Sequence, residues 1–101
     1  MDLKNLVNVN DDKNWFVYLL LCADSSLYCG ITKNLNQRFL LHVNGKGAKY
    51  TRGRGPLKLV WKSHKPVSHS EALALERKIK KLPKQKKTLL IKESEITGEI
   101  F

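Results

Sequence analysis

The chain has 101 residues, enough for one domain with a single core that needs no disulfide or structural metal. It holds no apolar run close to the roughly 20 residues of a membrane span, and its first residues lack the segments of a signal peptide, so we expect a cytoplasmic protein. Its formal net charge is +10, which favours polyanionic partners.

This positive charge is concentrated in the middle of the chain. Residues 15–92 carry 17 bases against three acids, a net charge of +14. Nucleic acid is the commonest cellular polyanion that such a domain attracts. Charge alone leaves two alternatives open, an anionic membrane surface and a solvated basic surface with no specific partner.

The first predicted elements form a β-hairpin. Residues 1–14 are polar and without periodicity, and they predict a flexible lead-in. Residues 15–22 form an unbroken apolar run, which is typical of a strand covered on both faces. Residues 23–26 suit a turn, and residues 27–31 resume as a second strand. Tyr18 and Tyr28 are the polar tips of this otherwise apolar hairpin.

The two cysteines lie on these paired strands. If Tyr18 and Tyr28 share a face, period-two alternation places Cys22 with them and Cys29 on the other face, which predicts free thiols. A zinc site with two histidines as further ligands is weakly supported, because the gap between the cysteines exceeds the usual spacing of ligands.

A short helix follows, with Asn34 as its N-cap. Four residues at helical spacing form one stripe that should face the sheet, namely Leu35, Arg38, Phe39 and His42. Taken singly, Arg38 reads as a side chain snorkelling along apolar surface, and His42 as a satisfied histidine near a helix C-terminus. Together, and beside the two tyrosines, they are candidates for a site.

Residues 45–56 form a loop with four glycines, four cations, one aromatic residue and no acid. Glycines allow close backbone approach to a ligand, cations neutralise phosphates, and an aromatic ring can stack on a base. The loop lacks the spacing of a P-loop. We predict that it binds nucleic acid, and the alternative is a mobile solvated loop. The candidate residues are Lys46, Lys49, Tyr50, Arg52 and Arg54.

The second half of the chain predicts a third strand and two helices. Residues 57–63 alternate as a strand, and a helix capped by Ser68 or Ser70 runs to about residue 82. Glu76 falls within about 40° of Ala72 on the apolar side of that helix. A carboxylate there is costly unless it is paired, for which Arg38 is the partner we expect, or bound to a metal.

Pro83 begins the last helix. We expect this helix to end near residue 92 and the acidic residues 93–101 to form a loose tail.

The ordered set Tyr18, Tyr28, Arg38, His42 and Glu76 resembles the GIY-YIG nuclease superfamily in its small single-domain form. The first motif of that family, Gly-Ile-Tyr, reads Phe16-Val17-Tyr18 here, and the second, Tyr-Ile-Gly, reads Tyr28-Cys29-Gly30. The similarity covers roughly residues 15–92. The chain departs from the family in both motifs, and it has no asparagine after Asn44, although some members use one near the C-terminal end of the domain.

The resemblance implies an α+β fold, a three-stranded antiparallel sheet flanked by about three helices. It also implies cleavage of phosphodiester bonds with one divalent ion, Mg²⁺ or Mn²⁺. In this interpretation Glu76 holds the metal, Arg38 donates to a non-bridging oxygen, and Tyr18 acts as base or positions water. Tyr28 orients water or phosphate, and His42 assists proton transfer or holds Tyr18. A tyrosine with a pKa of about 10 is a poor base at neutral pH unless nearby charges lower that value.

The absence of a separate recognition domain predicts weak sequence preference and selection by DNA structure. We therefore expect an endonuclease of DNA repair or recombination, acting on DNA more than RNA and not on membranes. We expect a monomer or weak dimer that can take a protein partner for specificity. The alternative is a non-catalytic nucleic-acid-binding domain with the same fold, and a third interpretation makes the basic face a docking site for an acidic protein.

Overall fold

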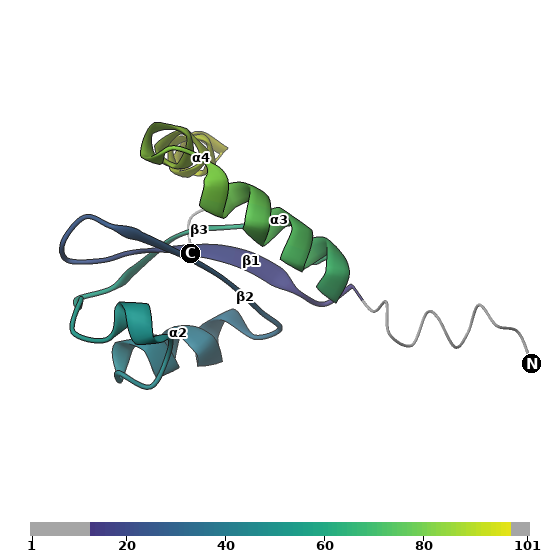
Figure 1. Cartoon of the computed structure of the whole chain (residues 1–101). Coiled ribbons are helices and arrows are strands. Elements are labelled where there is room, and N and C mark those ends of the chain that lie inside the picture. Colours follow the sequence, from purple (N-terminus) through teal and green to yellow (C-terminus); the bar gives the residue numbers. More distant parts are fainter. Residues whose placement is uncertain (1–12, 98–101) are drawn as a thin grey trace, which may run out of the picture.

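The computed structural model describes residues 13–97, with side chains as far as Glu93. One three-stranded antiparallel sheet, in the order β2-β1-β3, forms the middle layer (Figure 1). Helix α2 and the short 3-10 helix η1 cover one face of the sheet, and α3 and α4 cover the other (Figure 1). The elements are β1 (Phe16–Leu21), β2 (Leu27–Thr32), α2 (Leu35–Val43), η1 (Lys49–Thr51), β3 (Lys58–Lys62), α3 (His69–Lys81) and α4 (Lys84–Thr97).

The predicted hairpin is confirmed, and its register places both tyrosines on one face. Tyr18 lies opposite Gly30, and Leu20 lies opposite Tyr28. Opposed residues of an antiparallel pair share a face, and so do residues two apart on one strand. Tyr18 and Tyr28 therefore both point toward α2.

The opposite face of the hairpin carries the main core. Val17, Leu19 and Cys29 are buried there against Ala72 and Ile79 of α3. Strand β1 is the central strand, which explains why its sequence is apolar on both faces. Both cysteines are buried and free, as the alternation predicts.

Helix α2 starts where the sequence predicts. The Asn34 side chain accepts a hydrogen bond from the backbone N–H of Gln37 at 3.0 Å. Leu35 and Phe39 lie against the sheet beside Leu20. The chain leaves the helix through Gly45, whose φ of +73° is the left-handed conformation that favours glycine at a helix C-terminus.

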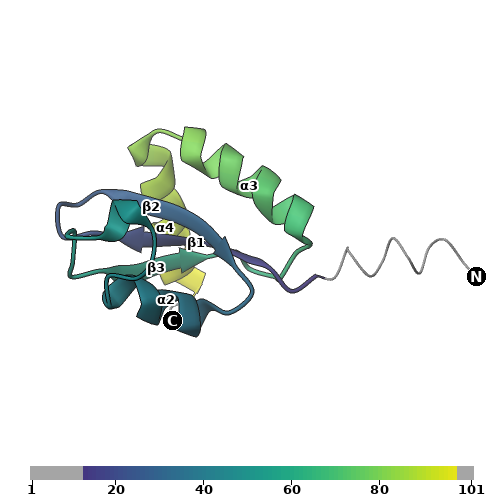
Figure 2. The same ribbon diagram turned by 60° about the horizontal axis from the view of Figure 1, so that its bottom comes forward.

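Helix α3 lies along β2 and β1, and α4 packs against β3 (Figure 2). Ser68 caps α3 in a capping box, in which its hydroxyl accepts from the backbone N–H of Glu71 and the Glu71 carboxylate accepts from the backbone N–H of Ser68. Helix α4 continues to Thr97, beyond the end expected near residue 92, because no glycine or proline interrupts the sequence between Pro83 and Gly98. No helix within residues 13–97 is long and apolar enough to cross a membrane.

Candidate active site

Four of the five residues singled out in the sequence meet on the α2 face of the sheet. The Tyr18 hydroxyl lies 2.9 Å from His42 Nε2, and both side chains are buried. The ring centroid of Tyr28 lies 6.4 Å from that of Tyr18 and 5.3 Å from that of His42. Arg38, one turn before His42 on α2, lines the adjoining pocket with Tyr18. Two strands and one helix thus place three polar rings and a guanidinium together.

The hydrogen bonds around His42 fix its tautomer. His42 Nδ1 lies 2.9 Å from the Thr51 hydroxyl oxygen, and that hydroxyl donates its one hydrogen to the Ala48 carbonyl at 2.9 Å. We therefore assign the hydrogen to Nδ1, which donates to Thr51. The other tautomer would let Nδ1 accept from the Ala48 N–H at 3.4 Å, a longer contact than the two bonds of 2.9 Å. It follows that Nε2 accepts from Tyr18, and the bonds run in one direction from Tyr18 through His42 and Thr51 to the backbone.

Two glycines make room for this chain of hydrogen bonds. A Cβ atom on Gly30 would clash with the hydroxyl and ring of Tyr18, which lies across the strand from it. A Cβ atom on Gly47 would clash with the imidazole of His42. Both glycines are needed for close approach of a ring to the backbone. This accounts physically for the glycine that ends the Tyr28-Cys29-Gly30 motif.

Burial keeps the hydrogen-bonded pair neutral. It raises the pKa of Tyr18 to about 12, although the adjacent Arg38 guanidinium acts in the opposite direction. Burial also lowers the pKa of His42 to about 4, and here the Arg38 charge acts in the same direction. At neutral pH the proton therefore stays on Tyr18, and proton transfer to His42 needs an added negative charge near the imidazole.

A stack of side chains continues outward from Tyr28. The rings of Tyr28 and Tyr50 are stacked, with centroids 5.9 Å apart and an interplanar angle of 27°. The Arg54 guanidinium also lies over the Tyr50 ring, at 4.3 Å from its centroid. Asp24 in the β1–β2 turn pairs with Arg54, and the Ala23 N–H donates to the Arg54 carbonyl at 2.8 Å. Tyr50 thus contacts both Tyr28 and Arg54, and the residue remains 42% exposed.

The other three candidate cations of the loop are Lys46, Lys49 and Arg52. Their side chains are exposed, on the same side of the sheet as the tyrosines. Arg54 differs from them because its charge is directed inward, onto Tyr50 and Asp24.

The structure does not bring Glu76, the fifth candidate, into this cluster. Glu76 lies on α3, on the opposite face of the sheet from α2 (Figure 1). Its side chain is 17% exposed, which agrees with the core-facing position predicted from the helical angle. The expected pairing with Arg38 is wrong, because the sheet separates the two helices. Glu76 pairs instead with Lys80, one turn along α3, at 3.4 Å.

The edge strand β2 is the element that adjoins both layers. Tyr28 points to the α2 side, and its neighbour Cys29 points to the α3 side. Burial raises the pKa of the Cys29 thiol to about 12, and the nearby charge of Glu76 contributes to the rise. Glu76 therefore lies near Cys29, and Cys29 is the residue next to Tyr28 on the edge strand β2.

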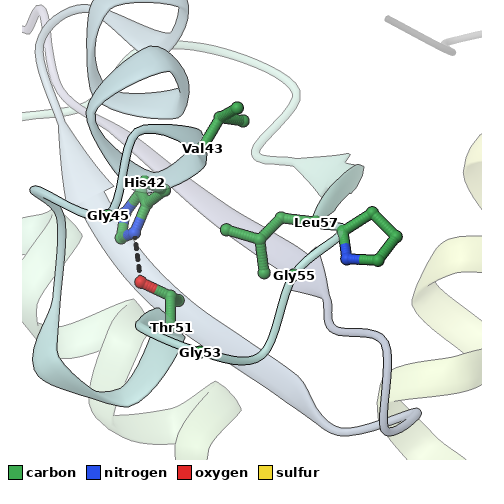
Figure 3. A pocket seen from close by; sticks show the side chains of 8 residues that line it. His42, Val43, Gly45, Thr51, Gly53, Gly55 and Leu57 are labelled. Atoms are coloured by element: carbon green, nitrogen blue, oxygen red, sulfur yellow. Dashed lines mark hydrogen bonds between the residues drawn. The ribbon is translucent and has the colours of Figure 1, made fainter.

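A pocket of about 330 Å³ lies behind His42, between the end of α2 and the glycine-rich loop (Figure 3). His42 and Thr51 are the polar side chains in its lining, and they are hydrogen-bonded to each other (Figure 3). The remaining wall is formed by glycines and by Val43, Pro56 and Leu57. The pocket offers a ligand little polar chemistry, and we assign it no role in the site.

Sequence reasoning missed three participants in the site, Thr51, Gly47 and Asp24. Thr51 is 2% exposed, yet in the sequence it is one small polar residue in a loop without periodicity. In the sequence, Gly47 is one of four glycines in a loop, and Asp24 is one polar residue of a predicted turn. The one available signal was the lack of acids in the loop, which left Asp24 as a partner for one of its arginines.

Comparison with known proteins gives one consistent result. The family model of the GIY-YIG catalytic domain matches residues 14–89. The chain is 51% identical over 77 residues to a UPF0213 protein of Vibrio cholerae, which covers 76% of each chain. It is 47% identical over 92 residues to a GIY-YIG domain-containing protein of Invertebrate iridescent virus 6, covering 90% of this chain and 93% of the viral one. A solution NMR structure of a UPF0213 protein from Bacillus halodurans is 45% identical, covers 77% of this chain and 82% of that one, and gives a TM-score of 0.49.

Proposed function

The chain belongs to the GIY-YIG family, whose domains are generally endonucleases, and on that premise we propose that it is a divalent-metal-dependent endonuclease acting on DNA. The observation that carries the proposal is the buried Tyr18–His42 hydrogen bond of 2.9 Å, flanked by Tyr28 and Arg38. The cluster can bind a phosphate and accept a proton beside it. We further propose weak sequence preference, structure-selective cleavage and a role in repair or recombination, because a basic surface contacts backbone and shape more than base sequence.

Glu76 is the residue that would hold the metal ion. Within residues 13–97 no group of three metal-ligating side chains comes together, and in this proposal the protein supplies the single carboxylate of Glu76. That donor set fits Mg²⁺ or Mn²⁺, since Mg²⁺ keeps several waters and is commonly bound through one or two carboxylates and substrate phosphates. When bound, the ion would stabilise the negative charge of the departing oxygen.

Arg38 would bind the scissile phosphate. Its half-buried guanidinium adjoins Tyr18, so a non-bridging oxygen placed there would accept from it beside the tyrosine hydroxyl. The hydrogen bonds would strengthen as negative charge develops on the phosphoryl oxygens. The Tyr28 hydroxyl, on the same face, would hold the phosphate or the attacking water in line.

Tyr18 and His42 would act as the base together. The attacking water gives a proton to the Tyr18 oxygen as Tyr18 passes its own hydrogen to His42 Nε2. His42 then carries two hydrogens, and its Nδ1–H remains bonded to Thr51. A bound phosphate brings the negative charge that raises the pKa of His42 from its low value of about 4 in the free protein. In this scheme the substrate itself enables the transfer.

The test is cleavage of labelled single-stranded, duplex, flap and four-way-junction DNA with Mg²⁺, Mn²⁺ or EDTA. We expect metal-dependent cutting that is lost in Glu76→Gln and unchanged in Glu93→Gln, an exposed carboxylate on α4. Tyr18→Phe should slow cutting by about 10²–10⁴-fold with DNA binding retained. Cutting that persists in Glu76→Gln, or is equally fast in EDTA, would refute the proposal.

One observation favours a second candidate, a non-catalytic nucleic-acid-binding domain. Glu76 is already paired with Lys80, and it lies in a different layer from Tyr18. Under this alternative all variants bind DNA with the salt dependence of a basic surface, and neither metal produces cutting of any substrate in the panel.

A further inference from the structure

A groove of about 250 Å³ runs along the outer edge of β2. It shares Tyr50 with the glycine-rich loop that the sequence singles out, and its other lining residues come from β2 and from helices α3 and α4. Its floor is the start of β2, one wall is aromatic, and the other wall comes from α3 and α4. The six lining residues are Leu27, Tyr28, Cys29, Tyr50, Lys80 and Lys87.

The charge of the groove is entirely positive. Lys80 and Lys87 come from different helices and meet at this one strand edge. Lys87 is half-buried, although a lysine side chain usually remains in solvent. Both lysines act on the Cys29 thiol, which places their charge at the groove floor. The nearby acid, Glu76, is paired with Lys80, and no acid among the described side chains forms an ion pair with Lys87.

The surroundings extend the positive charge. Residues 77–92 contain eight cations and no acid, so the corner between α3 and α4 is more basic than the loop with its four cations. Such a concentration attracts polyanions at long range. The groove is the place where this basic corner meets Tyr28 of the candidate active site.

The two walls suit an extended nucleotide strand. The stacked rings of Tyr28 and Tyr50 line the groove, and so do the side chains of Lys80 and Lys87. A single strand presents phosphates on one side and sugars and bases on the other, which matches this pairing of surfaces. A duplex turns its bases inward and offers the aromatic wall no such contact.

We propose that the β2-edge groove binds one extended strand of DNA, with Lys80 and Lys87 on its phosphates and the two tyrosines against its sugars or bases. The inference rests on the proposed function, because a strand in the groove passes Tyr28 next to the scissile position. It adds a substrate class to that function, DNA with an unpaired strand next to the cleavage site. Flapped, frayed and single-stranded DNA share this feature.

The test compares two neighbouring lysines of α4. Lys87 lines the groove, and Lys86 is exposed and does not, so Lys87→Ala and Lys86→Ala remove the same charge from adjacent positions. Lys87 is preferred to Lys80 because removing Lys80 would also release Glu76. The probe is fluorescein-labelled (dT)₈ in EDTA, with a blunt eight-base-pair duplex and (rU)₈ as the comparison ligands. Fluorescence anisotropy is measured over a series of salt concentrations.

We expect Lys87→Ala to weaken (dT)₈ binding about tenfold, the effect of losing one hydrogen bond between charged groups. The slope of log Kd against log salt should fall by about 0.7. Lys86→Ala should weaken binding by less than about threefold, since a solvated surface charge acts mainly through screening. Lys87→Arg should bind (dT)₈ with an affinity near that of the wild type. The affinity for the blunt duplex should be the same in Lys87→Ala and Lys86→Ala.

The proposed groove would be refuted if the two alanine variants weaken (dT)₈ binding equally. It would also be refuted if the wild-type protein does not bind (dT)₈. Equal or tighter binding of (rU)₈ would overturn its assignment to DNA. The proposed nuclease activity can fail separately. If binding depends on Lys87 but no metal produces cutting, the proposed strand-binding groove stands and the proposed nuclease activity is refuted. If DNA is cut but Lys86→Ala and Lys87→Ala weaken binding equally, the nuclease activity stands and the groove is refuted.

Discussion

Replacing Thr51 by valine tests whether the direction of the hydrogen bonds around His42 is as the structure indicates. Valine conserves the volume and branching of threonine, so it leaves no cavity and removes only the hydroxyl. That hydroxyl is the acceptor for His42 Nδ1–H at 2.9 Å. The Ala48 carbonyl keeps a second donor, the backbone N–H of residue 51 at 3.1 Å, so the loss falls on the histidine.

The expected cost follows from burial. His42 is 2% exposed, and a buried donor left without an acceptor costs about 1–3 kcal/mol. Thr51→Ser, the matched control, keeps the hydroxyl and loses one methyl group, which costs about 1 kcal/mol. We therefore expect the valine variant to be less stable than the serine variant, although valine is closer in size. A loss near 2 kcal/mol is large for a domain whose total stability is about 5–15 kcal/mol.

Urea unfolding measures the free energies, and ¹⁵N chemical shifts of the imidazole report the tautomer. Wild-type protein should show His42 with hydrogen on Nδ1. The valine variant should either lose about 2 kcal/mol with that tautomer retained or move the hydrogen to Nε2, which then donates to Tyr18. In the second case cleavage should fall sharply, because Nε2 no longer accepts. A valine variant as stable as wild type with Nδ1–H retained would refute the reasoning.

Three further predictions concern the same fold. The pKa of His42 is about 4 in the folded protein, and the ordinary value for histidine is 6.5. Between pH 6.5 and pH 4 the unfolded protein therefore binds a proton that the folded protein does not. The free energy of unfolding should fall by about 3 kcal/mol as the pH drops across this range. Urea unfolding at several pH values should show this loss in wild type and in His64→Gln but not in His42→Gln, and a loss that persists in His42→Gln would contradict the assignment. Gly30→Ala should cost about 1–3 kcal/mol by forcing the Tyr18 ring aside, seen in thermal melts and as a lost Tyr18–His42 contact by NMR; a melting point equal to wild type would show that the ring has room. Ser68→Ala should remove the capping box of α3 and lower the unfolding free energy by about 1 kcal/mol with cleavage retained, and a variant of wild-type stability would show that the cap contributes nothing.

Much of the fold could be predicted because its signals are local. The caps at Asn34 and Ser68, and the alternation that places Tyr18 and Tyr28 on one face, depend on residues within one turn or one hairpin. Helical periodicity also placed Glu76 correctly toward the core. The family resemblance is confirmed by the match over residues 14–89.

The incorrect expectation about Glu76 has a clear physical origin. Helical periodicity predicts that a side chain faces the sheet, but it does not predict which face of the sheet the helix covers. Arg38 and Glu76 were therefore expected to pair. The missed roles of Thr51 and Arg54 arise in the loop, where no period constrains direction and contacts are formed with residues distant in sequence. Asp24, for example, precedes its partner Arg54 by 30 positions.

The division of the site by the sheet has a consequence for how such a protein can diverge. The phenol and imidazole groups belong to one layer and the carboxylate to the other, so a substitution at Glu76 leaves the hydrogen bonds of Tyr18 and His42 untouched. Under the proposed nuclease function, a lineage could therefore lose cleavage in one mutational step while keeping its fold and the proposed affinity for DNA. Reversion to glutamate would also be a single substitution. Under the same proposal, one designed change at residue 76 would convert the nuclease into a DNA-binding protein.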